Sequence, residues 1–203
     1  IRIAVIGDMM LDEYIVGKVE RISPEAPVPV VNVESESFVL GGAANVLNNL
    51  CSLGAGAFAI GIRGDDINGE KLERELEKKG ADIGGLIIDK NRPTIIKKRI
   101  LAQHQQLLRL DWEKKGEIVS NVEDEVIAVF AKNIEKIDAV ILSDYDKGLL
   151  TKRVAGELIK IANKHNKIII VDPKPENSEN YKNATSMTPN TKEALACMRG
   201  MRG

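Results

Sequence analysis

The sequence has almost no net charge, because 29 Lys and Arg residues balance 30 Asp and Glu residues and leave a formal charge of −1. Such a chain has no electrostatic basis for binding nucleic acid or an anionic membrane. Long apolar runs are also missing, since none approaches the ~20 residues that a helix needs to span a bilayer. We therefore expect neither nucleic acid nor membrane as a partner.

Cysteine is scarce, and internal repeats and low-complexity tracts are absent. Cys51 and Cys197 are far apart in the chain and form no metal-binding spacing. Two such cysteines fit a reducing cytoplasm better than a disulfide framework. The sequence thus predicts a cytoplasmic protein, in which the Asn183-Ala184-Thr185 sequon has no role.

What the sequence does contain is an alternation of short apolar runs with helical patterns. This alternation is typical of βαβ units and a parallel sheet, and the length suits one α/β domain or one and a half smaller ones. We expect strands at 3–7, 57–62, 86–88, 139–142 and 167–171, and helices at 43–53, 67–79, 122–134, 152–164 and 191–198.

Two further segments, 94–101 and 106–112, alternate charged and apolar residues and predict strands with one polar face. Together with 28–33 and 38–40 they would form a small sheet outside the main layer, a lid. Period-two alternation puts Lys97 and Arg99 on one face, and Arg109 and Asp111 on one face. If the strands pair, the lid presents a basic patch suited to a phosphate; the alternative is the solvent face of a half-buried sheet.

Three predicted strands end in carboxylates, at Asp8, Asp144 and Asp172. Because ligands of open parallel sheets bind at the carboxyl ends of the strands, these acids should meet at one rim, which Asp12 also approaches. An Asp after a strand is equally often a turn former or helix cap. Lys147 and Lys174 follow two of the acids and suit hydroxyl and phosphate recognition, although single lysines are usually solvated.

The most informative segment is 21–45. Pro24, Pro27 and Pro29 lie in a Val-rich run that cannot be a central strand, because each proline lacks a ladder donor. An edge strand or flap suits them. Gly41 and Gly42 then allow close backbone approach, and the helix that follows points its N-terminus at the same place. This combination predicts a substrate site.

Several motifs resemble those of the ribokinase-like sugar kinases. Gly42 and Asn45, in GGAAN at 41–45, match the family's signature of a glycine pair followed closely by Asn, and TPNTKE at 188–193 resembles the TPNxxE signature. PEAPVPVV at 24–31, LSDYDKG at 142–148 and DPK at 172–174 resemble one branch, the bacterial heptose 7-phosphate kinases of lipopolysaccharide precursor synthesis. In some bacteria this kinase is half of a two-part enzyme that also carries a nucleotidyltransferase.

The resemblance implies a three-layer α/β fold with a mostly parallel sheet and a small β lid, about 13–40 and 94–112. The implied reaction moves the ATP γ-phosphoryl group to the anomeric hydroxyl of heptose 7-phosphate. The sugar hydroxyls would be bound by Asp12, Gly41, Gly42 and Asn45. The sugar phosphate would be bound by Lys97, Arg99 and Arg109, and Asp144 and Lys147 would line the rim. ATP and Mg²⁺ would face Lys174, Asn190 and Glu193, with Glu193 reaching Mg²⁺ through water. Pairing of lids would give a homodimer.

The sequence departs from this family at its end. No Gly-Ala-Gly-Asp loop, which carries the family's catalytic base, occurs in residues 1–203, and the ending from Met198 to Gly203 does not resemble the family's continuation. We therefore expect a truncated domain without its C-terminal third. Because phosphoryl transfer depends on positioning and charge stabilisation, this chain alone is expected to be a poor kinase or none. A fold that binds sugar phosphate without transfer, a kinase for another sugar and a non-functional fold remain as alternatives.

Overall fold

Two β-sheets organise the chain in the computed structural model, which describes residues 1–103 and 105–200, with side chains through Cys197. Residues 201–203, part of the ending that does not resemble the family's continuation, lie outside the described residues. The larger sheet has strand order β10-β9-β8-β1-β4-β5, and every pair in it is parallel. Its strands are β1 (Arg2–Gly7), β4 (Gly56–Arg63), β5 (Asp82–Ile88), β8 (Ala139–Ser143), β9 (Ile168–Asp172) and β10 (Ser186–Met187).

Helices cover both faces of this sheet, because successive residues of its strands point to opposite faces and apolar residues lie on both. Val5, Ala57 and Ala59 pack towards α1 (Ala43–Ser52) and α2 (Ile67–Lys78). Ala4, Phe58 and Ile60 pack on the opposite face, towards α3 (Ser120–Asn133) and α4 (Lys152–Lys164). The remaining helical elements are α5 (Thr191–Gly200) and the 3₁₀ turns η1 (Ile134–Lys136) and η2 (Pro175–Tyr181). Among the described residues, no helix combines the length and apolarity that crossing a membrane requires.

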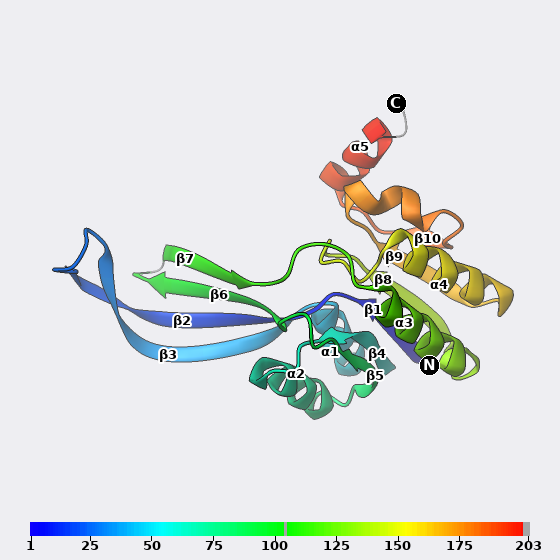
Figure 1. Ribbon diagram of the computed structural model, residues 1–203, viewed down its shortest axis with the longest axis horizontal. Helices are drawn as coiled ribbons and strands as arrows, with labels where there is room; N and C mark the ends of the chain where they lie inside the picture. The colour runs from blue at the N-terminus through cyan, green and yellow to red at the C-terminus, as the bar shows by residue number, and fades with distance from the viewer. Residues whose placement is uncertain (104, 201–203) are drawn as a thin grey trace.

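The smaller sheet, which we call the lid, extends away from the main body as a long arm (Figure 1). Its strand order is β3-β2-β6-β7, made of β2 (Met9–Ile22), β3 (Pro29–Gly42), β6 (Ile95–Ala102) and β7 (Gln105–Trp112). The outer pairs are antiparallel and the central β2–β6 pair is parallel. Because β2 follows β1 after one residue and β3 leads directly into α1, the base of the lid is fixed to the carboxyl ends of the main strands.

The strand and helix predictions for the main sheet are confirmed within a few residues, and the predicted strands 94–101 and 106–112 are β6 and β7. The sequence did not predict β2, and the two short segments 28–33 and 38–40 belong to one continuous strand, β3. The prolines lie where their missing N–H groups require: Pro24 and Pro27 precede β3, and Pro29 begins this edge strand.

Candidate functional site

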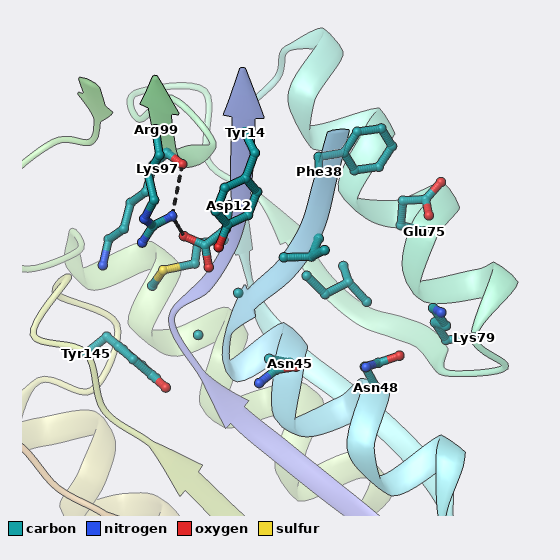
Figure 2. Close-up of a pocket in the computed structure, with 15 residues that line it drawn as sticks. Asp12, Tyr14, Phe38, Asn45, Asn48, Glu75, Lys79, Lys97, Arg99 and Tyr145 are labelled. Carbon is teal, nitrogen blue, oxygen red and sulfur yellow. Dashed lines mark hydrogen bonds and ion pairs between the residues drawn. The ribbon is translucent and has the colours of Figure 1, made fainter. Parts of the chain in front are cut away.

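A cleft of ≈ 620 Å³ lies where the base of the lid meets the N-terminus of α1. Figure 2 shows Asp12, Tyr14, Lys97 and Arg99 gathered on the lid side, with Asn45 of α1 and Tyr145 approaching from below. The cleft is lined by Met10, Asp12, Tyr14, Phe38, Val39, Leu40, Gly41, Gly42, Asn45, Asn48, Glu75, Lys79, Lys97, Arg99 and Tyr145.

Steric reasons favour glycine at positions 41 and 42, on the floor of this cleft, and most strongly at Gly42. A Cβ on Gly41 would lie 2.4 Å from Asp12 Oδ2, so only glycine lets that carboxylate rest against the backbone. Gly42 has φ +56°, and a Cβ there would lie 2.4 Å from the carbonyl oxygen of Asp8. These two positions open the space in front of the α1 N-terminus, as the sequence predicted for a site of close approach.

The lid places its charged residues on one face by strand register. In the strand register Asp12 lies opposite Lys97, Lys97 lies opposite Asp111, and Arg99 lies opposite Arg109. The predicted shared faces are therefore confirmed. Arg99 Nη1 donates to Asp12 Oδ1 at 2.6 Å, and the Arg99 guanidinium stacks over the ring of Tyr14 at 5.4 Å.

The positive charge of this face is partly neutralised by Asp12 and Asp111, which lie on the same face and pair with its arginines. Arg109 forms a bidentate pair with Asp111, at 2.8 and 2.9 Å. Arg109 is not one of the described residues that line the cleft. Lys97 remains beside Lys147 and Arg109, and burial together with the charge of Lys147 lowers the pKa of its ammonium. A phosphate entering here would relieve this repulsion.

The rim acids meet as predicted, but two of them serve as anchors below the surface. Asp8 is 2% exposed and accepts hydrogen bonds from the backbone N–H groups of Tyr145, Lys147 and Leu149, at 3.0, 3.1 and 3.3 Å. It thereby fixes the loop after β8. Burial raises the pKa of the Asp8 carboxyl to about 6, aided by the charge of Asp144, while the N–H donors oppose the shift.

This raised pKa predicts a specific pH dependence of stability. Because the folded pKa of about 6 exceeds the ordinary value of 3.8, the folded state holds a proton that the unfolded state loses between these two pH values. The contribution of Asp8 is thus fully present below pH 3.8 and is lost as pH rises through about 6. In urea titrations the free energy of unfolding, relative to Asp8→Asn, should fall by up to ~3 kcal/mol across this window. A flat difference would contradict the assigned titration.

Asp144 is also 2% exposed, and its carboxylate is fully engaged by the protein. It accepts from the Tyr181 hydroxyl at 2.7 Å, the Asn177 amide at 3.1 Å and the Lys174 backbone N–H at 3.2 Å. Burial and the Asp144 charge raise the pKa of Tyr181, so its hydroxyl stays protonated as the donor. The structure places Asp144 beneath the rim, with its oxygens turned to the loops after β8 and β9.

The predicted nucleotide-side residues lie together beside β9. Asn190 and Glu193 form a reciprocal capping box at the start of α5, with N···O distances of 2.9 and 3.0 Å, and Lys174 Nζ reaches Glu193 at 3.2 Å. Burial opposes the Lys174 charge, but Glu193 and Asp172 raise its pKa overall. Burial and the nearby charge of Glu193 raise the pKa of the Asp172 carboxyl.

Sequence reasoning missed several cleft residues. Tyr14 shares a strand face with Asp12, a signal that recognition of β2 would have supplied. Tyr145 lies inside the DYDKG motif, in which the charged residues carry the stronger sequence signal. Phe38, Asn48, Glu75 and Lys79 complete the opposite wall (Figure 2). They come from β3, α1, α2 and the C-cap of α2, so only tertiary packing brings them together.

A doubly covered parallel sheet, with a lidded cleft at its carboxyl edge, defines an α/β protein that binds a small ligand at that edge. A family model described as pfkB family carbohydrate kinase matches residues 1–200. A bifunctional protein HldE of Helicobacter pylori is 47% identical over 192 residues, covering 95% of this chain, and HldE of Wolinella succinogenes is 46% identical over 192 residues, also covering 95%.

The chain therefore belongs to the pfkB family of carbohydrate kinases, as its motifs predicted. Its fold is shared with the tetrameric inhibited form of Escherichia coli phosphofructokinase-2, with TM-score 0.74 over 98% of this chain and 64% of that chain, at 19% identity. The chain spans 42% of the Helicobacter relative and 40% of the Wolinella relative.

Proposed function

We propose that the chain supplies the sugar-phosphate site of a kinase that transfers the γ-phosphoryl group of ATP to the anomeric hydroxyl of heptose 7-phosphate. The observation that carries this proposal is the placement of the Asp12 carboxylate and the Lys97 and Arg99 cations on one lid face, next to the α1 N-terminus. A carboxylate accepts from sugar hydroxyls, whereas paired cations suit a phosphate.

In this proposal the sugar ring lies over Gly41 and Gly42. Asp12 accepts hydrogen bonds from ring hydroxyls, and the Asn45 amide, one of the lining groups, donates and accepts on the other side. The heptose assignment rests on the resemblance of segment 24–31 and of the DYDKG and DPK motifs. The bifunctional relatives agree with the two-part enzyme that this resemblance implies.

The distal phosphate would bind Lys97, Arg99 and Arg109, with Lys147 nearby. A sugar phosphate carries roughly −1.5 to −2 charges, by analogy with phosphorylated side chains, so several cations around it are expected. In the free protein Arg99 is paired with Asp12, Arg109 with Asp111 and Lys147 with Glu113. Binding would therefore exchange carboxylate partners for phosphate oxygens.

ATP would bind beside Lys174, Asn190 and Glu193. Glu193 and Asp172 interact electrostatically, and two neighbouring carboxylates fit a Mg²⁺ ion that keeps most of its waters. When bound, Mg²⁺ supplies charge neutralisation for the phosphates. Lys174 would hold a phosphate oxygen, and Asp144 would support the loops that carry Lys174 and Lys147. No residue of the chain is assigned as the base for the attacking hydroxyl.

We further propose that two chains pair through their lids, in a reducing cytoplasm where Cys51 and Cys197 stay as free thiols. Ile100, Leu108 and Leu110 share the lid face opposite Lys97, and Leu108 and Leu110 are 51% and 36% exposed. Burial of such an apolar face in a dimer would stabilise it. Sedimentation equilibrium tests the dimer.

Calorimetric titration of the chain with heptose 7-phosphate, and then with Mg-ATP, tests the proposal. We expect sugar phosphate to bind, and Arg99→Ala and Arg109→Ala to weaken it by about 10-fold or more each. Lys98→Ala is the matched control, because Lys98 is on the same strand but on the opposite lid face, paired with Glu13. Preferential binding of a hexose phosphate would favour a kinase for another sugar. No binding of any sugar phosphate by a cooperatively melting protein would refute the proposal.

A further inference from the structure

Arg92 lies in the segment that joins β5 to the lid strand β6, and its side chain is 8% exposed. A buried guanidinium is costly unless its donors are satisfied. Its nearest carboxylate, Asp89, is 3.6 Å from Nε, a weak contact for a charged pair. The other donors are directed at backbone carbonyls, and their partners lie in two segments that are far apart in the sequence.

The first segment is the linker by which the chain leaves the lid after β7. Arg92 donates to the carbonyl oxygens of Lys114, at 3.0 Å, Gly116 and Glu117. The second segment is the rim loop after β8, where Arg92 Nη1 reaches the carbonyl oxygen of Lys147 at 3.3 Å. One guanidinium thus joins three segments: the one that leads into β6, the linker that follows β7 and the rim loop after β8.

Lys147 is consequently held at three points. Its backbone N–H donates to Asp8 at 3.1 Å, its carbonyl accepts from Arg92, and its Nζ pairs with Glu113 of the lid linker at 2.8 Å. The two loops also bond directly, because the Ile118 N–H donates to the Gly148 carbonyl at 3.0 Å. This arrangement keeps the Lys147 ammonium near Lys97 on the lid.

We propose that Arg92 is a positioning residue that orients Lys147 towards the substrate phosphate by clamping the lid exit and the rim loop together. This inference rests on the proposed function for its ligand, a sugar phosphate. Lysine cannot replace Arg92 in this role, because the planar fork of arginine presents five donors, whereas an ammonium is a point charge with three.

The first test is a double-mutant cycle on sugar-phosphate affinity. Arg92→Lys should weaken the binding of heptose 7-phosphate by about 10-fold, as should Lys147→Ala. In the Lys147→Ala background, Arg92→Lys should cost little more, because its effect passes through Lys147. Additive losses would overturn the inference. Arg63→Lys is the matched control, since Arg63 is an equally buried arginine whose partners are Glu73 and the Gly64 carbonyl.

A second test is independent of any ligand. Hydrogen exchange should show faster exchange of the Ile118 and Leu149 amides in Arg92→Lys but not in Arg63→Lys, and guanidinium ion should restore protection in Arg92→Ala. Unchanged protection would refute the clamp. If the unmodified chain binds no sugar phosphate, the proposed function fails, and hydrogen exchange still decides whether Arg92 holds the two loops.

Discussion

Asp12→Ala is expected to abolish most of the binding of sugar phosphate, with a loss of ~100-fold or more in affinity. The substitution removes the carboxylate that accepts from the sugar hydroxyls, and hydrogen bonds to charged groups contribute about 1.5–3 kcal/mol each. It also releases Arg99, whose guanidinium is held by Asp12 at 2.6 Å and would lose its fixed direction. Calorimetric titration with heptose 7-phosphate measures the effect.

Glu13→Ala is the control for this prediction. Glu13 is the next residue of the same strand and carries the same charge, but it pairs with Lys71 and Lys98 on the other side of the lid. The Glu13→Ala variant should lose some stability and keep its affinity for sugar phosphate. Equal losses of affinity in both variants would show that the lid tolerates no charge change at all, and the specific role of Asp12 would be abandoned.

Asp144→Ala is expected to produce a large loss of stability, on the order of 3–5 kcal/mol. The substitution leaves the buried Tyr181 hydroxyl, the Asn177 amide and the Lys174 N–H without their shared acceptor. Such an effect lowers the melting temperature by several degrees or more. Urea titration and thermal melting followed by circular dichroism measure it.

Two companion variants separate the anchoring role of Asp144 from a direct contact with the sugar. Tyr181→Phe should lose a smaller part of the same stability, because it removes only one of the donors. Asp146→Asn, at an exposed position of the same loop with φ +56° that Asn tolerates, should change stability little. If folded Asp144→Ala protein also loses sugar-phosphate affinity while melting normally, Asp144 contacts the substrate directly and the anchoring interpretation is wrong.

The sequence by itself determined five strands of the main sheet and the helices that cover it, but it did not predict the short edge strand β10. Apolar runs ending in Asp8, Asp144 and Asp172 alternate with amphipathic helices. Parallel strands need long crossover connections, and these helices supply them, so the pattern predicts a parallel sheet. The same local rules located Gly41 and Gly42 and gave the shared face of Lys97 and Arg99. Each of these conclusions depends only on residues close together in the chain.

Tertiary structure decided the rest, because it depends on contacts between distant segments. The strand β2 was missed since its residues mix charged and apolar side chains, and only pairing with β3 and β6 stabilises it. The pairing of Arg109 with Asp111, the burial of Asp144 under Tyr181 and the bonds of Arg92 to Gly116 and Lys147 follow from side-chain directions in the packed molecule. Sequence spacing specifies which face a residue occupies, but the partner that meets it there is chosen by the fold.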